Sequence, residues 1–210
     1  MAERSLVVVS AGLSQPSSTR LLADRLAAAT EDGLRDLGAE PRVETIEVRD
    51  HAQELVNNLL TGFPAPRLQS AIDAVLGADG LIAVTPIFNA SYSGLFKLFF
   101  DVLEKDSLAG TPVLLGATGG TPRHSLALEH AVQPLFTYLN AAVVPTAVYA
   151  ATADWGTAGA ATDAGLGARI ERAGAELAGW VAARDAREAA DPIAEPVPFG
   201  EVLEAVRRGD

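Results

Sequence analysis

The feature that most limits the fold is the alternation of short apolar runs with helix-like segments. Three runs rich in Val, Ile and Leu have the length of buried strands: Ser5–Ser10, Gly80–Pro86 and Thr111–Gly116. Runs that stay apolar at successive positions are typical of strands covered on both faces of a parallel sheet. Ala142–Ala150 has the same character, whereas Val43–Val48 mixes apolar with charged residues, as edge strands do. The sequence therefore predicts five strands.

Between these strands, apolar residues recur at helical spacing. The segments expected to be helical are 18–37, 50–60, 67–76, 93–103, 124–139 and 165–189. Strands joined by helices form a doubly wound α/β sheet, and the charged second strand belongs at its edge. We therefore predict a flavodoxin-like parallel five-stranded sheet in the order 2-1-3-4-5. Residues 1–190 are expected to form this single domain, and 191–210 a tail.

Composition excludes several classes of function. Lys and Arg number 16 and Asp and Glu 27, so the net charge is −11. This charge argues against binding to nucleic acid or to an anionic membrane surface. The absence of cysteine excludes disulfides, thiolate catalysis and cysteine-based metal centres. No apolar run is long enough to cross a membrane, and the N-terminus lacks the apolar region of a signal peptide. We expect a soluble, cytoplasmic protein.

In a sheet of this order, ligands bind at the carboxyl ends of the strands where the strand order reverses. The segment after the first strand carries Ser10, Ser14, Ser17, Ser18 and Thr19 just before a helix. Hydroxyls and free N–H groups at a helix start bind phosphate, although serines there can also simply cap the helix. The glycine patterns of nucleoside-triphosphate and dinucleotide loops are absent. The sequence thus offers one candidate phosphate site.

Two further segments follow the third and fourth strands. In the first, Pro86 fixes the backbone, and Phe88 either lies against a planar ligand or packs beneath the loop. In the second, Gly119 and Gly120 either let the backbone approach a ligand closely or form an ordinary turn. Because all three segments end neighbouring strands of the predicted sheet, we expect them to form one site.

These two segments resemble the NADPH-dependent FMN reductase family. T-P-I-F-N-A-S-Y-S-G-L-F-K at 85–97 is similar to the family pattern T-P-x-Y-x-A-S-Y-S-G-x-x-K. A-T-G-G-T-P-R-H-S-L-A-L-E-H-A-V-Q-P-L at 117–135 is similar to its A-T-G-G segment, the following His and a Leu-Ala-Leu helix. The resemblance covers about residues 5–150 and is closest to reductases that supply reduced flavin to alkanesulfonate and other luciferase-like monooxygenases. Phe88 replaces the usual Tyr, and the first loop lacks the usual Gly before its first Ser.

The resemblance implies that the chain binds FMN and receives hydride from NADPH or NADH, with the chemistry carried by the flavin. No catalytic side chain is implied. The phosphate would lie among Ser10, Ser17, Ser18 and Thr19. The ring would lie between Pro86, Ile87, Phe88 and Asn89 on one side and Thr118, Gly119 and Gly120 on the other, and Ser91 is a further cofactor-binding candidate. Arg123 is the candidate for the 2′-phosphate of NADPH, and His124 could touch the dinucleotide or the flavin, or be a solvated residue.

Other readings remain open. The chain could be a quinone or azo reductase that uses bound FMN, a flavodoxin-like electron carrier, or a partner that holds flavin without turnover. Carriers resemble one another in a T-G-x-T first loop, which is absent here. No metal site is expected, because His124 and His130 lie about 120° apart around a helix and His51 is on another segment. No Gly-x-Ser-x-Gly elbow marks a hydrolase.

The segment 93–103 carries more apolar residues than one buried helix face needs: Leu95, Phe96, Leu98, Phe99, Phe100, Val102 and Leu103. We therefore expect a homodimer or tetramer built on this helix, in which an Asp at Phe100 would split the assembly. The alternative is that the whole stripe is core. The resemblance agrees with an oligomer and adds a possible flavin-dependent monooxygenase partner.

Overall fold

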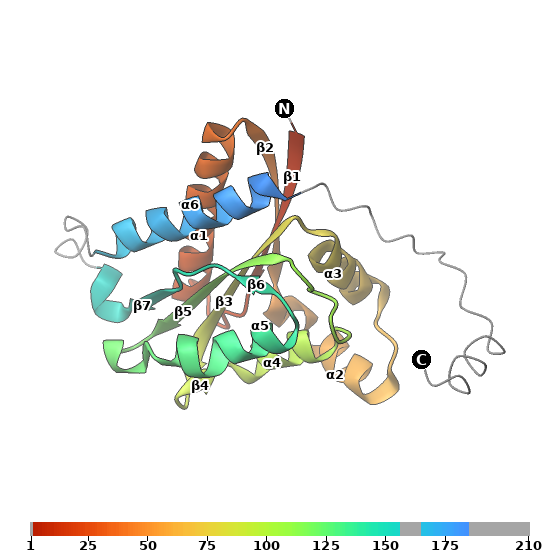
Figure 1. Cartoon of the computed structure of the whole chain (residues 1–210). Helices are drawn as coiled ribbons and strands as arrows, with labels where there is room; N and C mark the ends of the chain where they lie inside the picture. The colour runs from red at the N-terminus through yellow and green to blue at the C-terminus, as the bar shows by residue number, and fades with distance from the viewer. Residues whose placement is uncertain (1, 156–164, 185–210) are drawn as a thin grey trace, which may run out of the picture.

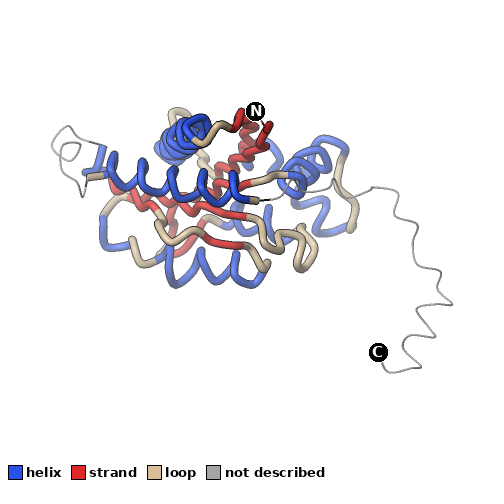
Figure 2. The backbone as a smooth tube through the Cα atoms, turned by 45° about the horizontal axis from the view of Figure 1, so that its top comes forward, coloured by secondary structure: helices blue, strands red, loops and turns tan. Residues whose placement is uncertain are grey.

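A parallel sheet lies between two layers of helices (Figures 1 and 2) in the computed structural model, which describes residues 2–155 and 165–184. The strands are β1 Ala2–Ser10, β2 Ala39–Glu47, β3 Gly80–Phe88, β4 Ser91–Tyr92, β5 Pro112–Gly119, β6 Ala142–Val143 and β7 Val148–Ala151. The α-helices are α1 Ser18–Asp36, α2 Ala52–Thr61, α3 Pro66–Gly77, α4 Gly94–Asp101, α5 Gln133–Tyr138 and α6 Leu166–Ala183. Shorter helical turns are η1 Val48–His51, η2 Pro122–His124, η3 Leu128–Val132 and η4 Thr152–Trp155.

The strand order is β2-β1-β3-β5-β6, which confirms the flavodoxin-like fold. The chain reverses its direction of travel across the sheet between β1 and β3, so the switch point lies at their carboxyl ends. The prediction of five strands was wrong in detail, since the described part of the chain has a seven-stranded sheet. β4 pairs antiparallel with the end of β3, and β7 pairs with β5 beyond β6.

The predicted strand Ala142–Ala150 is broken into β6 and β7. Pro145 lies between the two pieces and has no N–H group to offer to the ladder. Both pieces pair with β5, β6 at its start and β7 at its end. The break lets β7 follow β5 as far as Gly119, at the carboxyl edge of the sheet.

The predicted helix 124–139 is also interrupted. η2 begins at Pro122, a π-helical turn forms η3, and regular α-helix begins only at Gln133. Pro134 explains the wide turn, because it cannot donate to the carbonyl of His130 and its ring would clash with that carbonyl in an α-helix. The segment therefore reaches α5 through a bulge rather than as one helix.

β3 and β5 extend beyond the ends expected from their apolar runs. β3 continues through Phe88 into a hairpin with β4, and Asn89 and Ala90 form its turn with φ of 49° and 69°. Two adjacent residues at positive φ are the mark of a tight hairpin turn. β5 continues to Gly119, so part of the expected third loop is strand. The predicted end of the last helix, at 189, lies outside the described residues.

Each face of the sheet has its own apolar core. α1 and α6 cover one face, where Leu22, Leu26 and Leu177 pack on Leu6, Ile82 and Leu114. The other helices cover the opposite face, where Phe96, Phe99, Phe100 and Phe136 are almost fully buried. Within residues 2–155 and 165–184, none of the helices has the length and apolar character needed to cross a bilayer.

Candidate flavin site

A cavity of about 380 Å³ opens where the carboxyl ends of β1, β3 and β5 meet. This size falls in the range of small-molecule sites. It brings together these residues of the three predicted segments: Ser14, Ser17, Ser18, Thr19, Pro86, Ile87, Phe88, Thr118, Gly119 and Gly120. Leu13 and Thr152 also line it, and sequence reasoning missed both as site residues. The parallel strand order is what places segments so distant in sequence side by side.

The loop between β1 and α1 folds tightly against the helix start. Ser17 caps α1, because its Oγ accepts a hydrogen bond from the N–H of Arg20 at 3.2 Å. A Cβ at Gly12 would lie 2.1 Å from that Oγ, so a side chain at this position would displace the capping hydroxyl. The N–H groups of Ser18 and Thr19 fall in the first turn, where a helix supplies no acceptors. Hydroxyls and backbone N–H donors thus gather at the start of α1, which is the positive end of the helix dipole.

Two arginines, Arg20 and Arg49, lie beside this loop, and neither was identified from the sequence as a site residue. Arg49, just after β2, donates from Nη1 to the carbonyl oxygen of Ser14 at 2.9 Å. Glu47 lies between them: its Oε1 accepts from Arg20 Nη1 at 2.7 Å and is 3.7 Å from Arg49 Nη2. Hydrogen bonds to Asp24 and Glu47 raise the pKa of Arg20. These arginines could have been found only from the pairing of β1 with β2, which places Glu47 beside Ser10 at the start of the loop.

Ser10 does not line the cavity. It ends β1 between Glu47 of β2 and Val84 of β3, and its side chain is fully buried. Its Oγ has no hydrogen-bond partner among the described residues. A buried hydroxyl without a partner is unusual, so Ser10 remains a candidate donor beneath the loop.

Thr19 and Thr118 tie the first segment to the third. Their hydroxyl oxygens lie 2.8 Å apart, and both side chains are buried. Thr19 belongs to the first turn of α1 and Thr118 to the end of β5. The bond therefore fixes two walls of the cavity relative to each other.

The end of β3 supplies the third wall. Pro86 and Ile87 are buried, while Phe88 keeps 46% of its surface exposed and so does not pack beneath the loop. The Thr85 hydroxyl accepts from the N–H of Ser93 at 3.1 Å and donates to the Pro86 carbonyl, which holds the hairpin against the start of α4. Asn89 and Ser91 lie in that hairpin, and neither is among the residues that line the cavity.

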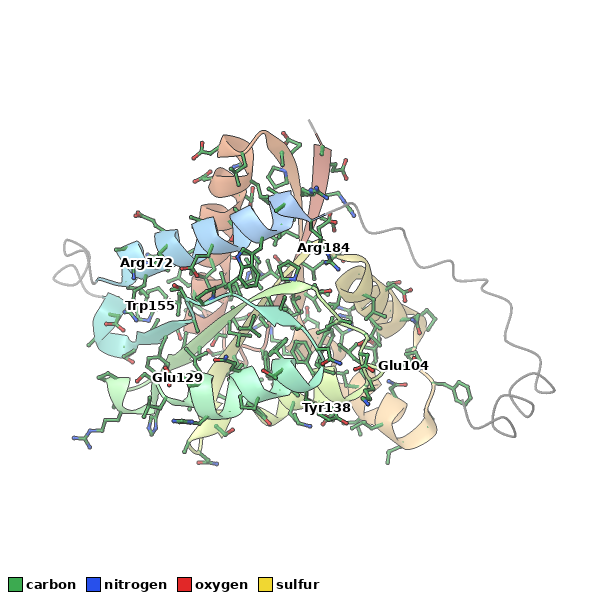
Figure 3. All side chains as sticks on the ribbon, in the orientation of Figure 1. Glu104, Glu129, Tyr138, Trp155, Arg172 and Arg184 are labelled. Carbon is green, nitrogen blue, oxygen red and sulfur yellow. The ribbon has the colours of Figure 1, made fainter. Side chains whose placement is uncertain are left out.

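Tyr149 supports the end of β5 from the neighbouring strand. It is 5% exposed, and its hydroxyl donates to the Thr121 carbonyl at 2.7 Å. Burial, with a further contribution from Asp154, raises the pKa of Tyr149. η4 directly follows β7, and its first residue, Thr152, lines the cavity. Trp155 anchors η4 by packing on the core beneath α1 and α6 (Figure 3), with Arg25 5.2 Å above its ring.

The two residues expected to meet the dinucleotide, Arg123 and His124, lie in η2 and are exposed. They follow the cavity wall but are not among its lining residues. His51 lies 2.8 Å from Glu54, measured from Nδ1 to Oε2. In the described ranges, no three or more His, Cys, Asp or Glu side chains gather as a metal site would require.

Comparisons with known proteins agree with this arrangement. Residues 5–156 match the model of the NADPH-dependent FMN reductase family. The chain is 41% identical over 150 residues to the FMN reductase (NADPH) of Pseudomonas aeruginosa, covering 71% of this chain and 78% of that one. It is 35% identical over 172 residues to the NADH-dependent FMN reductase SfnE of Pseudomonas putida, covering 80% and 90%.

Solved structures give the same result. An oxidoreductase from Corynebacterium diphtheriae superposes with a TM-score of 0.84 at 42% identity, covering 88% of this chain and all of that one. The apo form of the NADH:FMN oxidoreductase EmoB superposes with a TM-score of 0.71 at 29% identity, covering 94% and 99%. The chain therefore belongs to the NADPH-dependent FMN reductase family.

Proposed function

We propose that this protein reduces FMN with NAD(P)H and that the cavity at the ends of β1, β3 and β5 holds the flavin. The observation that carries the proposal is the meeting of the two family-like motifs with a hydroxyl-rich helix start in one cavity. Membership of the family supports the same reaction.

The donors around the cavity suit the two ends of FMN. Ser17, Ser18 and Thr19 would bind its phosphate at the start of α1, where the backbone N–H groups and the dipole favour an anion. The apolar end of β3, with the exposed ring of Phe88, would face the isoalloxazine ring across from Thr118–Gly120. Bound FMN would supply the hydride-accepting chemistry.

The chain itself binds and orients rather than exchanging protons. Of the described residues that line the cavity, none is an acid, a histidine or a base; they are aliphatic, aromatic, hydroxyl-bearing or glycine. Such a lining can hold the flavin ring in place, and holding reactants in a productive geometry can supply much of the rate. We therefore assign no catalytic side chain.

The dinucleotide and the acceptor are also part of the proposal. Relatives are named for NADPH or for NADH, so either donor fits. Arg123 follows the end of β5 in sequence and is the residue we propose for the 2′-phosphate. Delivery of reduced flavin to a monooxygenase partner rests on the motif resemblance. A cytoplasmic location, where both nucleotides are made, belongs to the same proposal.

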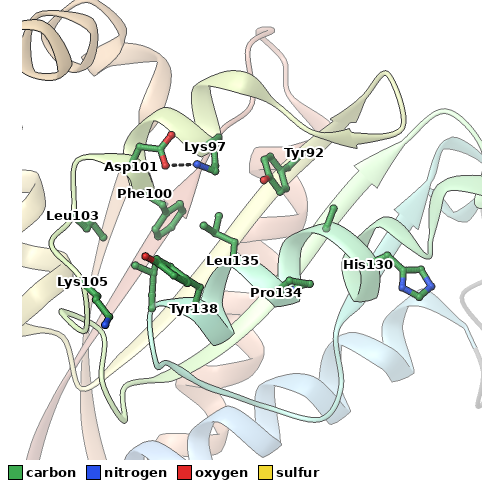
Figure 4. Close-up of a pocket in the computed structure, with 12 residues that line it drawn as sticks. Tyr92, Lys97, Phe100, Asp101, Leu103, Lys105, His130, Pro134, Leu135 and Tyr138 are labelled. Atoms are coloured by element: carbon green, nitrogen blue, oxygen red, sulfur yellow. Dashed lines mark hydrogen bonds and ion pairs between the residues drawn. The ribbon is translucent and has the colours of Figure 1, made fainter.

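We further propose that two or more copies associate through the groove between α4 and α5. Figure 4 shows this groove, of about 590 Å³, with Leu135 and Tyr138 on α5 facing Lys97 and Phe100 on α4. Phe100 is not the exposed anchor that the sequence suggested. It is 2% exposed, and its ring centroid lies 4.8 Å from those of both Phe96 and Phe136, so an Asp there would unfold the chain. Tyr138, at 68% exposed, is the residue to test.

Steady-state oxidation of NADPH and NADH by the purified protein tests the reaction, with FMN, riboflavin and a quinone as acceptors in turn. We expect saturable oxidation that depends on FMN. Turnover that needs only the quinone would favour the quinone reductase reading. Tight FMN binding without oxidation of either dinucleotide would favour an electron carrier.

A further inference from the structure

We infer that Tyr149 is a positioning residue for the isoalloxazine end of the flavin, acting through the backbone of Gly119–Thr121. The inference rests on the proposed function, because it assigns the cavity wall at the end of β5 to the ring of FMN. Tyr149 does not line the cavity. Its effect would pass through residues that do.

The phenol packs against the chain at the end of β5 at two points. Its hydroxyl donates to the Thr121 carbonyl at 2.7 Å. A Cβ built at Gly119 would lie 2.1 Å from the same oxygen and 3.2 Å from Cζ. The hydroxyl thus occupies the space that any side chain at 119 would need. Gly119 and Tyr149 are complementary, and together they set the path of the chain as it leaves β5.

Tyr149 is itself held firmly. Its carbonyl accepts from Arg169 Nη1 of α6 at 2.7 Å, and β7 pairs with β5 from Gly116 to Gly119. Asp154 of η4 accepts from the N–H of Ala151 at 2.8 Å and lies 3.6 Å from Arg169 Nη2. The phenol therefore transmits the position of β7, α6 and η4 to the wall. A support of this kind is what a site on a strand end needs to hold its geometry.

The inference separates the two ends of the ligand. Riboflavin and FMN share the ring and differ in the phosphate. Removing the Tyr149 hydroxyl should therefore weaken both flavins by the same factor, whereas a change at the start of α1 should weaken FMN alone. A merely structural role would lower stability without changing the affinity of the folded protein for either flavin.

The test is a pair of single variants and their combination, Tyr149→Phe, Gly119→Ala and the double variant. Flavin fluorescence titrations give the dissociation constants of FMN and riboflavin, and thermal melts are recorded on the same samples. Ser70→Ala is the control, because it removes an exposed hydroxyl that donates to the Pro66 carbonyl on α3, away from the cavity.

We expect Tyr149→Phe to weaken FMN and riboflavin alike by about 2- to 10-fold, the effect of one lost hydrogen bond. Gly119→Ala should weaken both by more, because its methyl meets the hydroxyl. In the double variant only Cζ remains close, so both flavin affinity and melting temperature should recover relative to Gly119→Ala.

A double variant no better than Gly119→Ala would overturn the inference. So would unchanged flavin affinity in Tyr149→Phe, or a loss confined to FMN. Wild-type protein that binds both flavins but oxidises neither dinucleotide would contradict the proposed reaction, yet the recovery in the double variant would still stand.

Discussion

The hydroxyl oxygens of Thr19 and Thr118 lie 2.8 Å apart, although the two residues are separated by 99 positions in the sequence. This bond joins the start of α1, where a phosphate would bind, to the end of β5, where the ring would lie. Both side chains are buried, and each also lines the cavity. The two halves of the candidate flavin site are thus linked inside the protein.

Removing one of the two hydroxyls should therefore cost stability. Thr19→Val keeps the shape but leaves the Thr118 hydroxyl buried and unpaired, which costs about 1–3 kcal/mol. Urea unfolding without flavin measures the loss. Adding Thr118→Val should cost less than the sum of the two single changes, because no unpaired hydroxyl then remains. Strict additivity would show that the bond does not form in solution.

Ser18 is the residue with which to test the phosphate end. It lines the cavity and is exposed, whereas Ser17 caps α1 and Thr19 is bonded to Thr118. Ser18→Ala should weaken FMN by about tenfold or more, the loss of one hydrogen bond to a charged group, and leave riboflavin unchanged. Paired fluorescence titrations compare the two flavins. Equal weakening would place the phosphate elsewhere.

Arg49 should matter for FMN without touching it. Arg49→Met removes the bond to the Ser14 carbonyl and one cation from beside the loop, so FMN affinity should fall several-fold. Arg42→Met is the matched control, since Arg42 lies within the edge strand β2 and forms an ion pair with the exposed Glu3, away from the loop. Isothermal titration with FMN compares the two variants. The same affinity in both would remove Arg49 from the account.

The raised pKa of Tyr149 predicts how stability changes in alkali. The unfolded phenol has the ordinary value of 10.0, and burial raises the folded value. The contribution of Tyr149 is therefore fully present below pH 10 and is lost as pH rises through the folded pKa. Denaturant unfolding at increasing pH should show this fall in the wild type and a smaller one in Tyr149→Phe. Identical profiles would show that Tyr149 titrates normally.

Tyr138 tests the association of copies. Tyr138→Asp puts a charge on the exposed side of the α4–α5 groove, so it should shift the protein toward monomer while leaving the fold intact. Light scattering gives the mass, and circular dichroism checks the fold. Wild-type protein that is already monomeric at micromolar concentration would remove the proposed interface.

The fold could be predicted because its signals are local. The strand order could be inferred without knowledge of contacts. Apolar runs such as that of β1 indicated buried strands, and the charged residues of β2 indicated an edge strand. Pro145 and Pro134, where the structure breaks a predicted strand and a predicted helix, are plain in the sequence. Each prediction nevertheless continued an apolar pattern through the proline. Where a residue without an N–H interrupts a pattern, the backbone rule takes precedence over periodicity.

From the sequence, the site could be predicted only in the loops that directly follow strands. The three loops meet at one cavity, and Ser17, Phe88 and Gly119 are among its lining residues; their part in flavin binding stays a prediction. The contacts of Arg49 with Ser14 and of Tyr149 with Thr121 were not predicted, because they arise from strand pairing rather than from sequence spacing. Asn89 and Ser91 were assigned to the site because they lie in the motif, yet in the structure they form a hairpin that shapes the wall from outside.

A crystal structure of the FMN complex would show where the flavin binds. We expect the phosphate at Ser17–Thr19 and the isoalloxazine ring between Phe88 and Gly119–Gly120. A flavin bound in the α4–α5 groove, or a phosphate away from the start of α1, would contradict it.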